Sequence, residues 1–301
     1  MNNTVSVAGG KLLVNSDLDG ALDVIAEAGF SVIDFWLCSY CKGADAPMKA
    51  KNWEEWLAGV GEEIAARGLS VGQVHAHWDH SHQIREDFTF EEPPEVVRRN
   101  FGAARMLGCT KLIFHPIQRW FRMPDESMRR PILDANVAWF ASLLPEAEKT
   151  GVEIHIENLF DHKHVSVPGD PVFPFGQTED LLYVADKLNH PLVKFCLDTG
   201  HANISGADIP AAIRAYGSRL GSLHLNDNYG KIAPIYEDVH LFPGLATIDW
   251  PAVFAALREV GYAGTLNMEP IAGLKKLPPE LRVIHLRAAR ETVVTMEKLW
   301  G

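Results

Sequence analysis

The segment at residues 195–205, FCLDTGHANIS, combines an acid and an imidazole at a spacing suited to metal binding. An apolar run ends in Asp198, the chain turns at Gly200, and His201 follows Asp198 by three positions. Because successive side chains of a strand point to opposite faces, the acid and the histidine can share a pocket only if the strand ends there. Carboxylate oxygens and imidazole nitrogens are common ligands of divalent metals. The segment therefore predicts a strand that breaks into a loop beside a metal site.

Six apolar segments of the sequence end in an acid or a histidine. Their last residues are His75, His115, Glu157, Asp198, His224 and Glu269. The positions two residues earlier are mostly polar or small, whereas the intervening positions carry large apolar side chains, which is the alternation of a strand that packs against helices on one face. Two glutamates, an aspartate and a histidine form an oxygen-rich ligand set suited to Mn²⁺, Zn²⁺, Mg²⁺ or Co²⁺. The six ends predict a metal site if the fold brings them together.

The apolar segments alternate with segments of helical periodicity. We expect strands over residues 5–7, 31–37, 70–75, 110–115, 152–157, 193–198, 220–224 and 265–269. We expect helices over residues 17–28, 53–67, 95–107, 128–150, 178–188, 209–216, 250–260 and 280–299. Eight strands, each followed by a helix, favour a single (β/α)8 TIM barrel over residues 1–301. The strand ends of such a barrel converge on one face, and the long loops at 158–177 and 226–249 would lie over that face.

Composition limits the possible partners. The 301 residues are 47% hydrophobic, which is enough for a large core, and the formal net charge of −11 gives no general attraction to nucleic acid or to an anionic membrane. The sequence lacks a basic segment followed by a long apolar run at its start and any apolar stretch of membrane-spanning length, so we expect a cytoplasmic protein. Four cysteines are too few for a disulfide framework in a chain of this length.

Several short motifs resemble those of the xylose isomerase-like barrel superfamily, which contains sugar phosphate isomerases and epimerases as well as endonuclease IV. The motifs are IHIENLF with Glu157, LDTGH with Asp198 and His201, HLND with His224, DVHLFPG with Asp238 and His240, and NMEP with Glu269. The resemblance extends from about residue 75 to residue 269 and is specific for the superfamily, not for a substrate. It implies that one divalent ion, with Mn²⁺ as the first choice and Zn²⁺, Co²⁺ or Mg²⁺ as alternatives, is held by Glu157, Asp198, His224 and Glu269.

The resemblance also implies an activity. The chain would be a metal-dependent isomerase or epimerase that acts on a sugar, ketose or keto-polyol by removing a proton next to a carbonyl. As in the ketose 3-epimerases that the chain resembles, Glu157 and Glu269 would act from opposite faces of the substrate, and His201 would bind the substrate beside the metal. The remaining candidates for substrate binding are His75, His115, Asp238, His240, Trp36, which could stack on a sugar ring, and Arg119, which could bind a phosphate or carboxylate.

Three other functions remain open on the sequence. A lyase or dehydratase acting on a keto-inositol or a 3-oxo glycoside, including C-glycoside cleavage, would use the same proton abstraction. An endonuclease IV-like phosphodiesterase would use several metals, and His75, His115, His201, Asp238 and His240 resemble its extra ligands. Against it, no histidine precedes His75 and no basic track is evident for a duplex. A binding barrel without catalysis would leave the ligand set unused. We also expect association into a dimer or tetramer through outer helices or top loops.

Overall fold

Eight parallel strands form the centre of the molecule. The computed structural model describes residues 3–9, 18–77, 84–85, 87–118, 126–160, 174–230, 238–269 and 274–301. The strands are β1 (Val5–Ala8), β2 (Val32–Trp36), β3 (Ser70–His75), β4 (Lys111–Phe114), β5 (Glu153–Glu157), β6 (Val193–Asp198), β7 (Leu220–His224) and β8 (Leu266–Met268). They pair in the order β7-β6-β5-β4-β3-β2-β1-β8, and a bridge between Leu225 and Met268 joins the two end strands. This order confirms the predicted (β/α)8 barrel.

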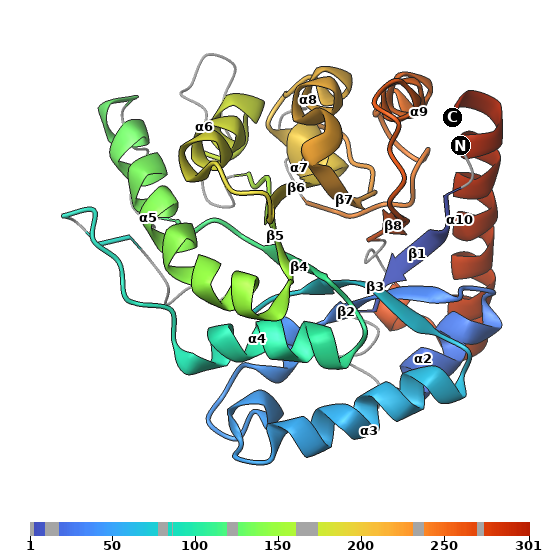
Figure 1. Cartoon of the computed structure of the whole chain (residues 1–301). Helices are drawn as coiled ribbons and strands as arrows, with labels where there is room; N and C mark the ends of the chain where they lie inside the picture. Colours follow the sequence, from blue (N-terminus) through green and yellow to red (C-terminus); the bar gives the residue numbers. More distant parts are fainter. Residues whose placement is uncertain are drawn as a thin grey trace.

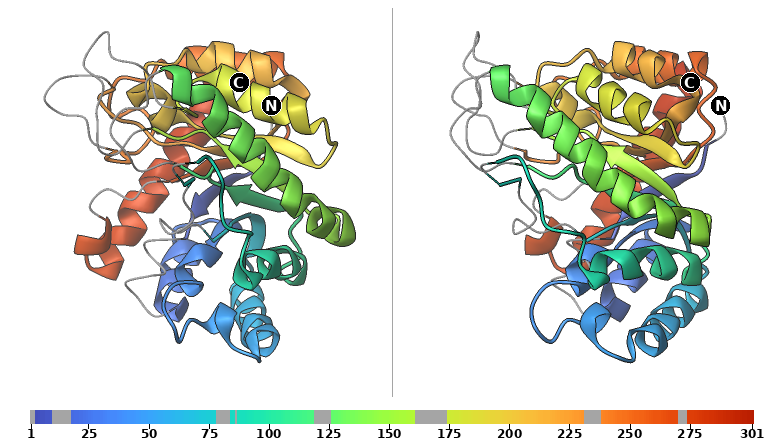
Figure 2. Two further views of the ribbon diagram at one scale, coloured as in Figure 1. Left: turned by 90° about the vertical axis from the view of Figure 1, so that its left-hand side faces the viewer. Right: turned by 60° about the vertical axis from the view of Figure 1, so that its left-hand side comes forward.

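The helices lie around the outside of the strands (Figures 1 and 2). They are α2 (Leu18–Glu27), α3 (Trp53–Ala66), α4 (Glu95–Met106), α5 (Glu126–Thr150), α6 (Thr178–Leu188), α7 (Thr199–Ile204), α8 (Ile209–Tyr216), α9 (Trp250–Glu259) and α10 (Pro279–Trp300). The two chain ends lie side by side (Figure 1), where the backbone N–H of Asn3 donates to Glu297 Oε1 at 2.7 Å. The last helix therefore closes the outer ring beside the first strand.

The predicted alternation of side chains along the strands is confirmed. Phe114 of β4 faces the helices, and its ring centroid lies 5.6 Å from that of Phe101 in α4 and 6.0 Å from that of Trp139 in α5. The side chains on the other face of the strands point into the barrel, where they are buried although many are polar. This inner set includes Ser6, Asp34, Gln73, His155, Ser222 and Asn267. Bulky branched residues such as Val, Ile and Leu dominate the interior of most TIM barrels, whereas this inner set is polar.

One local prediction is wrong. The chain after Asp198 does not continue as a loop but enters the short helix α7. Asp198 is the N-cap residue of this helix, and its Oδ1 accepts a hydrogen bond from the backbone N–H of His201 at 2.7 Å. A helical turn, and not a loop, therefore separates Asp198 from His201 and fixes the position of His201 relative to Asp198.

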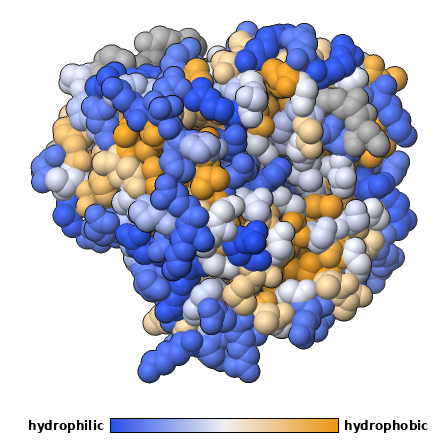
Figure 3. Space-filling view, in the orientation of Figure 1, coloured by the Kyte–Doolittle hydropathy of each residue, from blue (hydrophilic) through white to orange (hydrophobic). Residues whose placement is uncertain are grey.

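Hydrophilic residues cover most of the face seen in Figure 3, with hydrophobic residues in scattered patches. Among the described residues, the exposed large hydrophobic side chains are Met106, Tyr229, Leu245, Leu281, Ile284 and Leu299. No helix within the described ranges combines the length and the apolar character needed to cross a membrane.

Replacing Gly221 by alanine tests how closely the barrel interior is packed. Gly221 lies in β7, and a Cβ atom there would collide with the imidazole of His155, which is fully buried. That ring is held by Ser222 Oγ at 2.8 Å and by Glu153 Oε2 at 3.0 Å, so it cannot move without losing a partner. We expect Gly221→Ala to lower the free energy of unfolding by about 1–3 kcal/mol in urea denaturation.

Gly59→Ala is the matched control for this substitution. Gly59 lies in α3, and a Cβ atom there would meet nothing within 4 Å. Because alanine is a better helix former than glycine, Gly59→Ala should raise the free energy of unfolding by about 0.5–1 kcal/mol. Equal stabilities of the two variants would contradict the described packing.

Candidate metal and catalytic site

Four predicted metal ligands lie together at the carboxyl ends of the strands. One donor atom from each of Glu157, Asp198, His224 and Glu269 lies within 4.8 Å of the others, and all four residues are buried. His224 Nδ1 lies 2.9 Å from Glu157 Oε1 and 3.5 Å from Glu269 Oε2. The structure therefore assembles, from four different strand ends, the ligand set that the sequence suggested.

Backbone contacts at the strand ends fix these side chains. Glu157 and His224 are the last residues of β5 and β7, and Glu269 follows the last residue of β8. The backbone N–H of Glu269 donates to the carbonyl oxygen of Leu225 at 3.1 Å, across the seam that closes the barrel. The position of Glu269 thus depends directly on barrel closure.

Two asparagines that the sequence analysis did not single out hold Asp198. Asn158 Oδ1 accepts from the backbone N–H of Asp198 at 2.7 Å, and Asn158 Nδ2 donates to its carbonyl oxygen at 2.9 Å. Asn226 Nδ2 donates to Asp198 Oδ2 at 2.8 Å. Gly200 leaves the space for Asn226, because a Cβ atom at this position would collide with the Asn226 amide. Asn158 directly follows the strand-end residue Glu157, and Asn226 lies two positions after His224, which is the signal in the sequence that could have found them.

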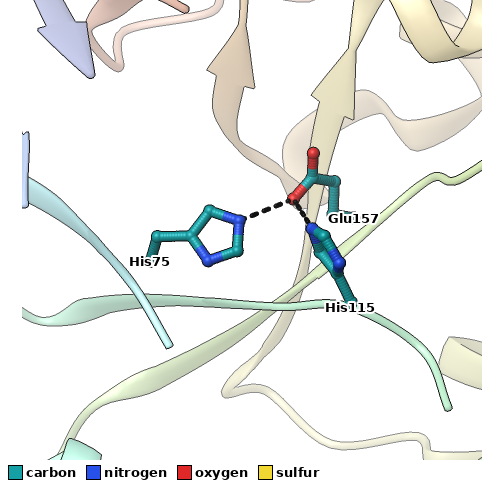
Figure 4. Close-up of side chains that lie close together, drawn as sticks. All are labelled: His75, His115 and Glu157. Carbon is teal, nitrogen blue, oxygen red and sulfur yellow. Dashed lines mark ion pairs between the residues drawn. The ribbon is translucent and has the colours of Figure 1, made fainter. Parts of the chain in front are cut away.

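Two histidines flank the other side of Glu157 (Figure 4). His115 Nε2 lies 3.1 Å and His75 Nε2 lies 3.5 Å from Glu157 Oε2. The two imidazole rings meet edge to face, with centroids 4.8 Å apart. Although Glu157 Oε2 is buried, no aligned hydrogen-bond donor reaches it within the part of the chain that the structure describes. This oxygen is therefore available to a cation.

A third group of donors contains His201, Asp238 and His240. Asp238 Oδ2 lies 2.6 Å from His240 Nε2 and 3.6 Å from His201 Nε2. His201 Nδ1 lies 2.8 Å from the carbonyl oxygen of Asn158, which can only accept, so His201 donates through Nδ1 and keeps Nε2 toward Asp238. His240 Nδ1 lies 3.4 Å from Glu269 Oε2, which joins this group to the four-donor cluster.

The protein shifts the pKa values of the two glutamates in opposite directions. Burial would raise the pKa of Glu157, but the nearby His224 and His115 hold it well below its usual range. Burial raises the pKa of Glu269 to about 7, and the charges of His224 and His240 only partly oppose this effect. A pair of carboxyl groups with separated pKa values is typical of sites that move protons.

The donor set fits a divalent cation. Four oxygen and nitrogen donors of suitable chemistry lie in one buried cluster. Glu157 Oε2 and Asp238 Oδ1, two buried carboxylate oxygens, lack hydrogen-bond partners among the described residues. Burial of several carboxylates is costly unless a positive charge compensates them, and a cation would supply that charge.

The remaining predicted site residues lie at the rim or outside the described ranges. Trp36 is half-buried at the end of β2, and its ring centroid lies 5.3 Å from that of His75. Arg119 lies outside the described residues, as do residues 161–173 and 231–237 of the two predicted top-face loops. Asp238 and His240 follow directly after the second of these gaps.

Asp227 anchors the segment that carries Asp238 and His240, and the sequence analysis missed it. Asp227 is fully buried and forms an antiparallel bridge with Leu241. Its carboxylate accepts five hydrogen bonds of 2.9–3.2 Å, four from backbone N–H groups and one from an indole. The donors are Asn228, Gly244, Ala246, Ile248 and Trp250. One acid after the β7 end therefore holds residues 241–250, the described part of the chain that leads into α9.

Asp227→Asn tests this anchor. The substitution keeps the shape of the side chain but replaces one carboxylate oxygen by an NH₂ group. This NH₂ group would face the N–H donors that the oxygen accepted from, so those buried donors would lose their acceptor. We expect the free energy of unfolding to fall by about 1–3 kcal/mol in urea denaturation. Asp249→Asn is the control, because Asp249 caps α9 by accepting from the backbone N–H of Ala252 and asparagine caps helices equally well. A loss no larger than that of the control would contradict the anchoring role.

Comparison with known proteins agrees with the fold. The model of the xylose isomerase-like TIM barrel family matches residues 22–288. An L-ribulose 3-epimerase of Mesorhizobium japonicum is 25% identical over 257 residues, which cover 84% of this chain and 75% of that protein. A D-psicose 3-epimerase of Enterocloster bolteae is 36% identical over 92 residues, which cover only 31% of this chain and 27% of that protein. A crystal structure of the IOLI protein with a bound zinc atom superposes with a TM-score of 0.73 at 18% identity and covers 99% of both chains. The chain belongs to the family of xylose isomerase-like TIM barrels.

Proposed function

We propose that this chain, an enzyme of the sugar epimerase and isomerase kind, is a divalent-metal-dependent isomerase or epimerase that removes a proton next to a carbonyl of a sugar, ketose or keto-polyol. The observation that carries the proposal is the presence of two glutamates, Glu157 and Glu269, in one buried cluster with Asp198 and His224. The similarity to an L-ribulose 3-epimerase over most of the chain supports the same conclusion.

The metal would be held by Glu157, Asp198, His224 and Glu269. Mn²⁺ is the first choice, with Zn²⁺, Co²⁺ or Mg²⁺ as alternatives, because all four donors are oxygen or nitrogen atoms. When bound, the cation supplies positive charge close to the carbonyl oxygen, where negative charge develops as the neighbouring carbon loses its proton.

The protein side chains would move the proton. Glu157 and Glu269 extend from β5 and β8, which are three strands apart around the barrel, so their carboxylates can reach a substrate from different sides. One would accept the proton from carbon and the other would return a proton to the opposite face. His201, whose Nδ1–H is already used by the carbonyl of Asn158, would offer Nε2 to a substrate hydroxyl. We further propose substrate contacts for His75, His115, Asp238, His240, Trp36 and Arg119.

Exchange of the substrate proton with solvent tests the role of Glu157. We expect Glu157→Gln to retain part of its metal affinity but to lose exchange of the α-proton with D₂O by about 10²- to 10⁴-fold, because the amide cannot accept the proton. Proton NMR of the substrate in D₂O measures this rate. Glu153→Gln is the control, because Glu153 lies on the same strand but contacts His155 away from the cluster, at 3.0 Å. Undiminished exchange in Glu157→Gln would exclude it as the base.

A screen of ketoses, keto-inositols and 3-oxo glycosides, with Mn²⁺ and after treatment with EDTA, tests the substrate class. A lyase that eliminates a β substituent would use the same proton abstraction, so the products distinguish it from an isomerase. Turnover that survives complete metal removal would contradict the proposed metal dependence.

A phosphodiesterase with several metals is a second candidate, because a specific observation favours it. Two further groups of three oxygen and nitrogen donors lie beside the cluster among the described residues: His75 with His115 and Glu157, and His201 with Asp238 and His240. Together the groups offer donors for more than one ion. The acidic net charge of −11 and the epimerase relatives favour the sugar enzyme.

Metal stoichiometry separates the two candidates. We expect one ion per chain by inductively coupled plasma mass spectrometry after saturation and desalting, because within the described part of the chain the central group alone offers four donors. Asp238→Asn should then leave the count at one, whereas in a multi-metal enzyme it should remove an ion. Three ions in the wild-type protein, reduced to two by Asp238→Asn, would favour the phosphodiesterase.

A further inference from the structure

Asp34 lies at the bottom of the candidate metal site, inside the barrel. It belongs to β2, is fully buried, and lies two residues before Trp36 on the same strand face. The sequence gives no sign of its role, because its partners are distant in the chain. The partner that matters for the metal site is His224, which is 190 positions away in the chain. Its Nε2 lies 3.1 Å from Asp34 Oδ2.

Three N–H groups converge on this single oxygen. Besides His224 Nε2, Asp34 Oδ2 faces Gln73 Nε2 at 3.1 Å and Asn267 Nδ2 at 3.2 Å. The orientations of the two amides are fixed independently, since Gln73 Nε2 also donates to the carbonyl of Leu223 and Asn267 Oδ1 accepts from Ser6 Oγ. Asp34 Oδ2 is therefore an acceptor only, and the hydrogen bond with His224 requires the proton to be on His224 Nε2.

A local irregularity of the sheet produces this arrangement. The register between β2 and β3 shifts after Ile33, so that Ile33 pairs with Val71 while Asp34 pairs with Gln73. The extra residue on β3 is Gly72, where a Cβ atom would collide with Val32. Bulges of this kind change the direction in which a side chain points, and here the bulge sets Gln73 beside Asp34.

We propose that Asp34 is a positioning residue that fixes His224 as a metal ligand through Nδ1. This inference rests on the proposed metal-dependent function. When His224 binds an ion as a neutral ring, its proton stays on Nε2 beside Asp34 and its lone pair is on Nδ1, the nitrogen that lies 2.9 Å from Glu157 Oε1 and 3.5 Å from Glu269 Oε2 and so belongs to the cluster. Asp34 reaches His224 across the barrel interior, since β8 and β1 separate β7 from β2 in the sheet order. The carboxylate thus determines both the tautomer and the ring orientation of the ligand.

Metal affinity is the first test. The dissociation constants for Mn²⁺ and Zn²⁺ of the full chain are measured by competition with a fluorescent chelator. We expect Asp34→Asn to raise both constants by about 10- to 100-fold, because the neutral amide is a weaker acceptor for His224 Nε2–H. Ser222→Ala is the matched control. Ser222 is a buried polar residue of β7, the strand that carries His224, but its hydroxyl group contacts His155 and not His224. This substitution should leave both constants unchanged.

The tautomer of His224 is the second test and needs only the wild-type protein. In the ¹⁵N NMR spectrum of the zinc-loaded chain, the proposal requires a protonated Nε2 and a metal-shifted Nδ1 for His224. A metal-shifted Nε2 with a protonated Nδ1 would overturn it. This measurement decides the question even if Asp34→Asn does not fold.

The outcomes separate this inference from the proposed function. If the wild-type chain binds neither Mn²⁺ nor Zn²⁺, the metal-dependent function and the role of Asp34 both fail. If the wild-type chain binds metal and a folded Asp34→Asn variant binds it equally well, only the role of Asp34 fails. Weaker binding by Asp34→Asn, together with unchanged binding by Ser222→Ala and the predicted tautomer, supports the assignment.

Discussion

Three carboxylates share one buried pocket, and their mutual repulsion is the constraint to which the rest of the site responds. Glu157, Asp198 and Glu269 place oxygen atoms within 4.8 Å of one another. Like charges this close cannot all remain ionised in a buried pocket without compensation. Nearby histidines supply part of the compensation, and the remainder is seen in Glu269, whose pKa burial raises to about 7. A divalent cation would take over the roles of the histidine charges and of the proton on Glu269. This is the physical reason that the cluster fits a metal.

Two of the three carboxylate residues are held by groups that do not depend on a cation. Asp198 caps α7 and accepts from Asn226, while Glu269 is held through its backbone to Leu225 at the barrel seam. Side chains fixed in this way lose little freedom when a ligand binds, so the site is organised in advance. The polar interior serves the same purpose, because a layer of Val and Leu at the positions of Asp34 and Asn267 could not direct the imidazole of His224.

Much of the fold and of the central cluster could be predicted from the sequence. Strands and helices follow from periodicity, and strand-end acids and histidines such as Glu157 and His224 follow from the rule that the strand ends of a barrel converge. These are local patterns combined with one rule of topology. The same rule indicates which side of each strand faces the interior, as the contacts of Phe114 with α4 and α5 confirm.

The residues that the sequence did not reveal are those whose roles depend on distant partners. Asp34 contacts His224 over 190 positions, and Asn226 contacts Asp198 over 28 positions. Although Asn226 lies in the HLND motif, neither a period nor a motif shows which distant residue each of these side chains contacts, because the pairs are created when the barrel closes and brings distant strands together. Asp227 was missed for a related reason, since the five donors around its carboxylate exist only after the chain beyond β7 has folded back. The helix α7 was missed because its six residues are too few for a helical period to show.

Because the donors come from different strands, binding of an ion would be coupled to the stability of the barrel. The four donors come from β5, β6, β7 and the end of β8, so they are together only in the folded chain. An ion that binds the folded chain but not the unfolded one stabilises the fold by RT ln(1 + [M]/Kd), where [M] is the concentration of the free ion. Two of the donor residues, His224 and Glu269, lie on either side of the seam between β7 and β8, where a bridge between Leu225 and Met268 joins the two end strands. The ion would therefore hold together the part of the barrel whose closure creates its own binding site.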